Sequence, residues 1–260
     1  MGGLRSPIRD LKSFAKERHI SILPQSDIIR EAISRITYVY GGDPLTLKAN
    51  FDRVISDAET LAYKIYIEKE LTYGSGVLNA FALHLIESGE IRSLNDLPAV
   101  LGDHFKVMDR FYLSIAQSRK SRAGKGFEDI HNTLFSRLGY PFTAQAVING
   151  KPDFIMPSVE YYKRNPMDSI IFTAKRTLRE RWRQIVTEGT RGLGFYLATI
   201  DPGVSSEQLG EMMSHRIYMV VPESLKTEKY NGRENVISFM EFFRDHLDPR
   251  MDAWRRKGVI

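Results

Sequence analysis

The first part of the chain carries apolar residues at the three-to-four-residue spacing of amphipathic helices. In residues 26–40 this spacing gathers five apolar side chains on one stripe, formed by Ile28, Ile29, Ala32, Ile33 and Ile36. A Gly-Gly-Asp-Pro stretch at 41–44 interrupts the pattern, which resumes over 45–74. Two more helical segments are predicted over 75–91 and 93–120, the second interrupted by Pro98 and Gly102. The pattern therefore predicts a mostly helical region from residue 1 to 115.

From about residue 116 the pattern changes to short apolar runs that alternate with amphipathic segments. Helices are predicted over 121–139, 178–189, 205–215 and 236–258. Five runs bounded by Gly, Pro or Asn have the composition of strands, at 142–148, 151–157, 169–175, 192–200 and 216–222. Strands that alternate with helices predict a layered α/β domain over residues 116–260.

Composition narrows the classes of protein that fit this pattern. The 260 residues are 42% hydrophobic, which is enough for a sizeable core, and no cysteine is present. Disulfides and thiolate metal sites are therefore excluded. No apolar run approaches the ~18 residues of a membrane span, and the first residues lack a signal-peptide pattern, so we expect a soluble protein. The net charge of +5 favours a polyanionic partner only modestly, because many basic proteins bind no nucleic acid.

Three polar residues of the α/β part fall at places that suit phosphodiester chemistry. Asp153 begins one predicted strand, Lys175 ends another, and Glu188 lies on the following helix. Because side chains alternate along strands, the aspartate and the lysine can share one face of the sheet. Carboxylates can hold a divalent cation, and a lysine can position or deprotonate the attacking water. Taken singly, however, such residues are more often a turn aspartate and a solvated strand end.

The helix that follows Lys175 opens with three charged residues in a row, Arg179, Glu180 and Arg181. Arginine suits bidentate contact with guanine in the major groove, and glutamate can accept from the cytosine amino group. The run is thus chemically able to read G·C pairs. An ordinary exposed helix face with ion pairs between its side chains explains the same composition, and composition alone favours that alternative.

The stretches KPDF and IIFTAKRTLRERWRQIVTEG together resemble the PD-(D/E)XK restriction endonucleases. Within them they resemble the EcoRII, PspGI and SsoII group, which cuts around a CC/GG core as in CCNGG or CCWGG. Lys175 lies 22 residues after Asp153, and Glu188 lies 13 residues after Lys175, as in that group. The common nuclease pattern has an acid two residues before the lysine. Here Thr173 stands at that position and Glu188 on the helix takes the place of the acid, which is the variant of this group. The resemblance implies a central mixed β-sheet flanked by helices, with a mostly helical N-terminal region.

The resemblance also implies roles for individual residues. The catalytic set would be Asp153, Lys175, Glu188 and Glu128, of which Asp153 and Glu188 would hold a Mg²⁺ ion. Arg179 and Arg181 would read guanine and Glu180 cytosine. Glu128 matches a glutamate that lies near the active site on the helix before the Pro-Asp strand.

Two further groups of residues have less specific patterns. One is a run of basic residues with no acidic residue among them, which suits contacts with DNA phosphates. A solvent-exposed helix start explains the same run equally well. The run comprises Arg119, Lys120, Arg122 and Lys125. Some relatives flip central bases out of the duplex and stack them on a side chain of the N-terminal region. Tyr38, Tyr40 and Phe51 could supply such a platform, although aromatic residues there are more often part of a core.

The resulting hypothesis is a Mg²⁺-dependent type II restriction endonuclease that cuts double-stranded DNA and leaves 5′-phosphate ends. It would act as a homodimer in the cytoplasm of a prokaryote, with pairing of dimers into tetramers left open. A cognate DNA methyltransferase would protect the host. Residues 1–115 would serve DNA contact and dimerisation, and residues 116–260 would form the nuclease core. Two alternatives remain, namely a structure-specific or repair nuclease of this class and a catalytically inactive DNA-binding protein on the same fold.

Overall fold

The structure, a computed structural model, describes residue 8 and residues 10–145, 152–178 and 195–260. It divides into two compact units, one comprising residues up to 28 together with 62–122, the other comprising 29–61 together with 123–260. We call them the helical unit and the sheet unit. The predicted assignment of roles to residues 1–115 and 116–260 stays a prediction. Among the described residues, no helix has the length and apolar character needed to cross a membrane.

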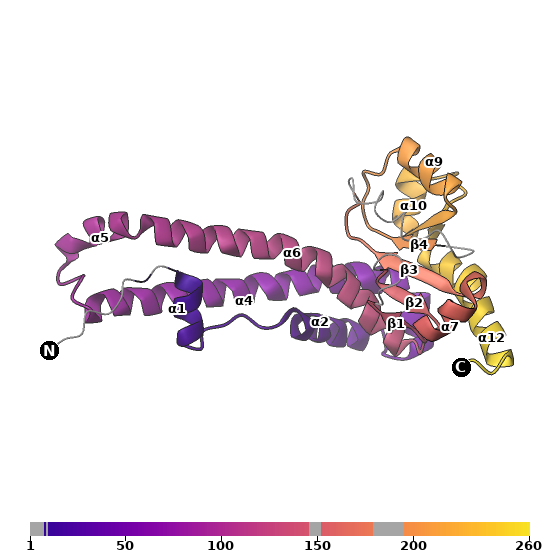
Figure 1. Ribbon diagram of the computed structural model, residues 1–260, viewed down its shortest axis with the longest axis horizontal. Helices are drawn as coiled ribbons and strands as arrows, with labels where there is room; N and C mark the ends of the chain where they lie inside the picture. Colours follow the sequence, from indigo (N-terminus) through magenta and orange to yellow (C-terminus); the bar gives the residue numbers. More distant parts are fainter. Residues whose placement is uncertain (1–7, 9, 146–151, 179–194) are drawn as a thin grey trace. The chain divides into compact units, whose positions relative to one another are not determined.

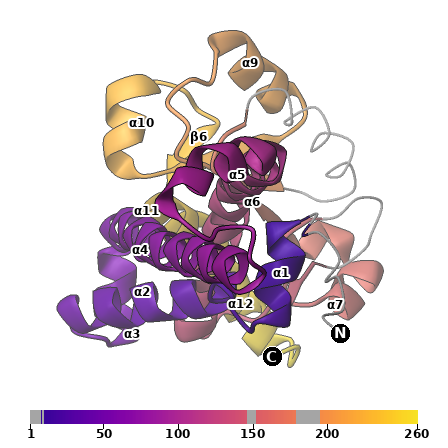
Figure 2. The ribbon, with the colours of Figure 1, turned by 90° about the vertical axis from the view of Figure 1, so that its left-hand side faces the viewer.

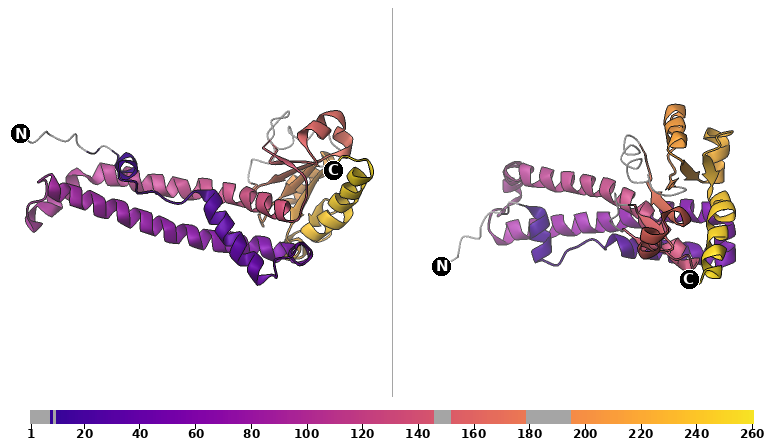
Figure 3. Two further views of the ribbon diagram at one scale, coloured as in Figure 1. Left: turned by 90° about the horizontal axis from the view of Figure 1, so that it is seen from below. Right: turned by 45° about the vertical axis from the view of Figure 1, so that its right-hand side comes forward.

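The helical unit contains helix α1 (Leu11–Glu17) and parts of two long helices, namely α4 (Phe51–Glu87) from residue 62 onward and α6 (Phe105–Arg137) up to residue 122. These two helices are joined through η1 (Leu94–Asp96) and α5 (Leu97–Asp103). Within this unit, α4 and α6 run side by side, and α1 lies against them (Figures 1 and 3). Their facing stripes form one apolar core, which includes Leu11, Phe14, Val77, Phe81 and Phe111. The core explains why the amphipathic pattern of the sequence recurs in each of the three helices.

Helix α4 continues to Glu87, whereas the sequence predicted a break near residue 74. Gly74 and Gly76 lie inside the helix, where each glycine costs about 1 kcal/mol relative to alanine. A Cβ atom added to Gly76 would lie 3.5 Å from Cγ2 of Ile20, which is an ordinary van der Waals contact, so packing does not require glycine there. Helix α6 likewise runs without interruption through residue 120, where two separate helices were predicted. Tertiary packing therefore outweighs the local break signals in both helices.

The sheet unit contains a six-stranded sheet whose strands follow one another in chain order, β1-β2-β3-β4-β5-β6. The first three strands pair antiparallel and the last four pair parallel, which confirms the predicted mixed sheet. The strands are β1 (Thr143–Ala144), β2 (Phe154–Met156), β3 (Ile170–Ala174), β4 (Phe195–Ala198), β5 (Ile217–Val221) and β6 (Val236–Ser238). Helix α2 (Gln25–Val39) begins in the helical unit, and α3 (Pro44–Ala49) belongs to the sheet unit.

One face of the sheet is covered by α7 (Val159–Arg164), α9 (Ser206–Ser214) and α10 (Glu223–Lys229). Helix α10 lies beside β6 (Figure 2), and α9 packs against β5. Alternate strand residues, among them Ile155, Ile171 and Met219, pack against side chains of these helices, as the two-residue period of a strand requires. The short η2 turn (Pro166–Asp168) leads into β3.

The opposite face is lined with aromatic rings. Phe135 of α6 lies 5.1 Å, between ring centroids, from Phe172 of β3. Phe242 lies 5.1 Å from Phe172 and 4.8 Å from Tyr196 of β4. These phenylalanines come from α6 and from η4 (Phe242–Leu247), which follows α11 (Phe239–Glu241). Helices therefore cover both faces of the sheet, and the fold is the predicted α/β arrangement.

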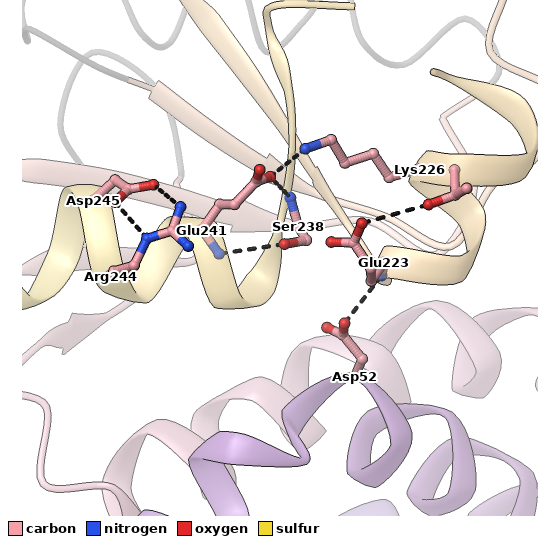
Figure 4. Close-up of polar contacts among 8 residues, drawn as sticks. Asp52, Glu223, Lys226, Ser238, Glu241, Arg244 and Asp245 are labelled. Carbon is pink, nitrogen blue, oxygen red and sulfur yellow. Dashed lines mark hydrogen bonds and ion pairs between the residues drawn. The ribbon is translucent and has the colours of Figure 1, made fainter. Parts of the chain in front are cut away.

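The segment 236–258 was predicted to be one helix, but its first three residues form strand β6. The helix starts after Ser238, whose Oγ accepts from the backbone N–H of Glu241 while its own N–H donates to the Glu241 carboxylate (Figure 4). Three apolar residues are too few to reveal a strand period, so only the parallel pairing with β5 distinguishes them. Further along, the segment η4 is π-helical and leads into α12 (Asp248–Arg256). Pro249, in the first turn of α12, has no backbone N–H to donate to the preceding turn, so a regular α-helix cannot continue unbroken through this point.

The start of α10 is capped by a residue that lies far away in the sequence. Pro222 occupies the N-cap position and has no side-chain acceptor. Instead, Oδ2 of Asp52, in the first turn of α4, accepts from the backbone N–H of Glu223 at 3.0 Å (Figure 4). Burial raises the pKa of the Asp52 carboxyl group. This contact fixes the first turn of α4 against the end of β5.

Candidate active site

Asp153 and Lys175 meet where strands β2 and β3 continue into their flanking residues. The antiparallel register pairs Phe154 with Phe172, which places Asp153 opposite Thr173 and on the same face as Lys175. The lysine Nζ lies 3.0 Å from each carboxylate oxygen of Asp153. The backbone N–H of Ala174 donates to Oδ2 of Asp153 at 2.8 Å. Two of the predicted catalytic residues are thus brought into one ion pair.

Thr173 occupies the position that carries an acid in the common nuclease pattern. Its side chain is almost fully buried, and its hydroxyl oxygen accepts from the backbone N–H of Asp153 at 3.5 Å. No carboxylate could stand there without a buried negative charge directly beside Asp153. The hydroxyl therefore holds the β2 end in place without adding charge to the site.

The electrostatic state of Asp153 departs from that of an ordinary carboxyl group. Burial raises its pKa most strongly; Lys175 lowers it, and the charge of Glu128 raises it again, so that the pKa reaches about 6. At neutral pH the group is ionised despite being only 5% exposed. A buried carboxylate next to a second acid has a strong requirement for positive charge, which Lys175 meets in part.

Glu128, the third predicted catalytic residue among those described, lies on α6 and is half-buried. Its charge is one of the causes of the raised pKa of Asp153. One oxygen of its carboxylate, Oε1, accepts from Nε2 of Gln145 at 2.8 Å. Gln145 was not among the residues predicted from sequence, because a glutamine at a strand end carries no recognisable signal.

The remaining predicted base-reading and metal-binding residues lie outside the described part of the chain. They are Arg179, Glu180, Arg181 and Glu188. Their roles stay predictions.

Two of the four predicted phosphate-contacting residues are engaged within the helical unit. The guanidinium of Arg119 forms a fork-like ion pair with Glu70, which is only 4% exposed. The guanidinium of Arg122 donates to the carbonyl of Leu23 at 3.2 Å and lies over the ring of Tyr66. Lys125 is exposed, whereas the side chain of Lys120 lies outside what the structure describes.

The three aromatic residues considered for base stacking lie in different environments. Tyr38 is 89% exposed, and the hydroxyl of Tyr40 donates to Oδ2 of Asp57 at 2.8 Å. Phe51 is 1% exposed and packs 4.8 Å from Phe243 between ring centroids. Phe51 is therefore a core residue, and Tyr38 is the ring of the three that solvent reaches most.

The donor set suits a hard divalent cation. Asp153 and Glu128 offer carboxylate oxygens, which are the ligands that Mg²⁺ prefers in proteins. Within the described ranges, no group of three acidic or histidine side chains gathers to hold a metal. The two carboxylates present fit such a site, and Glu188, which the sequence predicted as the second ligand beside Asp153, lies outside those ranges.

A model of the EcoRII C-terminal family matches residues 90–243, which is more than half of the chain. The chain belongs to the EcoRII C-terminal family. This family assignment confirms the resemblance seen in the sequence motifs. The matched segment includes Asp153, Lys175 and Glu128.

Named relatives of this family are restriction enzymes. The type II restriction enzyme SsoII of Shigella sonnei is 31% identical over 180 residues, covering 64% of this chain and 59% of SsoII. The type II restriction enzyme EcoRII of Escherichia coli is 29% identical over 238 residues, covering 86% of this chain and 51% of EcoRII. The chain thus spans between half and three fifths of the length of these two relatives.

Solved structures show the same architecture. Metal-depleted Ecl18kI in complex with uncleaved DNA matches with a TM-score of 0.77 and 25% identity, covering 95% of this chain and 84% of Ecl18kI. The restriction endonuclease PspGI, bound to substrate DNA, matches in fold with a TM-score of 0.65 and 23% identity, covering 89% of this chain and 94% of PspGI. The restriction-endonuclease fold predicted from the sequence is thereby confirmed.

Proposed function

We propose that this protein is a Mg²⁺-dependent type II restriction endonuclease that hydrolyses double-stranded DNA. The observation that carries the proposal is the Asp153–Lys175 ion pair on adjoining strands, with the charge of Glu128 beside it. Such an arrangement can bind a cation and a phosphate at one point, and it occurs here in a chain of the EcoRII C-terminal family.

Each residue of the site has a task that follows from its position. Asp153, held by the Ala174 N–H, would act with Glu188 as a ligand to the cation. A bound Mg²⁺ would offset the negative charge that develops on the phosphate oxygens. Lys175, with its ammonium 3.0 Å from Asp153, would orient the attacking water and interact with the scissile phosphate. That Ecl18kI was solved metal-depleted with uncleaved DNA supports a metal requirement.

The proposed substrate is a short palindromic site with a CC/GG core, such as CCNGG or CCWGG, cut to leave 5′-phosphate ends. Arg179 and Arg181 would contact guanine, and Glu180 would contact cytosine. A homodimer would match the two-fold symmetry of the site, so that each subunit cuts one strand. A cognate methyltransferase would protect the same sequence in the host. The DNA complexes of Ecl18kI and PspGI support a double-stranded DNA substrate.

The test is digestion of plasmid DNA of known sequence with Mg²⁺ or with EDTA, followed by sequencing of the fragment ends. We expect discrete fragments whose ends share one CC/GG-containing sequence, and no cleavage in EDTA. General nicking without a common sequence would instead support a structure-specific or repair nuclease. Wild-type protein that cuts no DNA with Mg²⁺ would support the DNA-binding alternative.

A lysine-to-alanine pair separates catalysis from folding and binding. Lys175→Ala should abolish cleavage and still bind the cognate duplex, since it removes the ammonium that acts on the scissile phosphate. Lys229→Ala, which removes an exposed lysine from α10 of the same unit, should cut like the wild type. Equal cleavage by Lys175→Ala and the wild type would exclude the proposed role of Lys175.

A further inference from the structure

We propose that Gln145 is a positioning residue of the active site, which holds the Glu128 carboxylate on the side of Asp153. The inference rests on the proposed nuclease function and adds a residue to it. Gln145 makes two hydrogen bonds, one through its backbone to the strand of Asp153 and one through its side chain to Glu128. It therefore joins two acids that come from different elements of the sheet unit.

The backbone bond extends the antiparallel β1–β2 ladder by one residue pair. The register pairs Ala144 with Phe154, and the N–H of Gln145 then donates to the carbonyl of Asp153 at 2.9 Å. Gln145 is thus the cross-strand neighbour of Asp153. Any displacement of this strand end would therefore move the backbone of Asp153 as well.

Gln145 also has a backbone conformation that L-amino acids adopt with difficulty. Its φ is +52°, in the left-handed region, which glutamine visits rarely. Such a conformation persists where surrounding contacts over-determine it, and residues of this kind cluster at functional sites. Here the two hydrogen bonds are those contacts, and together they direct the amide toward Glu128.

The side-chain bond gives the amide a chemical role at the site. Nε2 of Gln145 donates to Oε1 of Glu128 at 2.8 Å, while the backbone N–H of the same residue donates to the carbonyl of Asp153 at 2.9 Å. Two neighbouring carboxylates repel each other, so a freely rotating Glu128 would turn away from Asp153. A neutral donor holds the glutamate near the aspartate without neutralising it, which preserves both charges for a cation. This is how outer residues orient metal-binding carboxylates in other proteins.

The experiment compares two variants with a matched control. Gln145→Ala removes the amide and adds no backbone strain, because glutamine already has the unfavourable φ; Gln145→Gly removes the amide and relieves the strain. Both keep the backbone N–H that bonds to Asp153. Gln117→Ala truncates an exposed glutamine of α6 and serves as the control. The readouts are Mn²⁺ affinity by calorimetry, duplex binding in Ca²⁺, and the single-turnover cleavage rate across a Mg²⁺ titration.

We expect both Gln145 variants to bind Mn²⁺ about 10-fold more weakly and to need about 10-fold more Mg²⁺ for half-maximal cleavage, with duplex binding unchanged. In a Glu128→Ala background the Gln145→Ala change should have no further effect, because the amide acts through that carboxylate. Gln117→Ala should match the wild type throughout.

Three outcomes would overturn the inference while leaving the nuclease proposal intact. The first is unchanged Mn²⁺ affinity and Mg²⁺ dependence in both Gln145 variants. The second is a loss of Mn²⁺ affinity on Gln145→Ala that is as large in the Glu128→Ala background as in the wild type. The third is a loss of duplex binding alongside the loss of Mn²⁺ affinity, which would indicate a general structural role. A wild-type protein that cuts no DNA would instead overturn the proposed function. The Mn²⁺ titration would then still decide whether Gln145 positions Glu128.

Discussion

Replacement of Asp153 by asparagine should remove cleavage and at the same time change how stability depends on pH. In the folded protein the Asp153 pKa is raised from its ordinary value of 3.8 to about 6, mainly by burial. When the pKa of a carboxyl group is higher in the folded state than in the unfolded state, the stability that the group contributes is fully present below the unfolded-state pKa, where the group is protonated. That contribution is lost as pH rises from 3.8 towards 6. Above pH 6 the ionised aspartate therefore costs stability relative to a neutral residue.

The size of this effect follows from the two pKa values. With 3.8 in the unfolded chain and about 6 in the folded protein, ionisation costs about 1 kcal/mol at pH 4.5 and about 3 kcal/mol at pH 7.5. Asparagine does not titrate. The free energy of unfolding of Asp153→Asn minus that of the wild type should thus rise by about 2 kcal/mol over this interval. The lost contacts to Lys175 and Ala174 offset the difference by a nearly constant amount and leave its slope unchanged.

The assay is urea unfolding of both proteins at several pH values between 4.5 and 7.5, under identical salt. Asp168→Asn provides a control of opposite sign. Burial raises the pKa of Asp168, but its hydrogen bonds with Lys257 and Tyr161 outweigh burial and leave that pKa below its ordinary value. The corresponding difference for Asp168→Asn should therefore fall or stay level as pH rises. A difference for Asp153→Asn that stays flat or falls would refute the proposed electrostatic state of the site.

Three more expectations follow from the structure and the motifs. Glu128→Gln should lower the pKa of Asp153, because the Glu128 charge helps to raise it. In a Glu128→Gln background, the pH range over which Asp153→Asn changes the stability should then shift downwards. An unchanged range would count against an interaction between Glu128 and Asp153. Phe135→Ala should cost about 3–5 kcal/mol of unfolding free energy in urea, since this fully buried ring contacts both Phe154 and Phe172. Arg181→Ala should cost about 1–3 kcal/mol of discrimination at one G·C pair, measured with substituted duplexes, and an unaltered preference would remove its role in base reading.

The sequence by itself determined the α/β class of residues 116–260 and singled out Asp153 and Lys175 as candidate site residues. Two-residue alternation along strands allows Asp153 and Lys175 to share one face, and the register that pairs Phe154 with Phe172 brings them to it. The motif spacing indicated the same two residues, and the family resemblance added Glu128. The apolar stripes of α4 and α6 likewise followed from helical periodicity, because that pattern depends only on which face is buried.

Tertiary structure alone decided the features that depend on contacts between distant residues. Strand β6 is too short to show a period and exists through its pairing with β5. Helix α4 continues through Gly74 and Gly76 because packing in the helical unit outweighs their weak local propensity. Gln145 reaches the site because the β1–β2 register places it opposite Asp153 and within reach of Glu128. Local patterns fix which face of an element is buried, whereas register and packing fix which residues meet across elements.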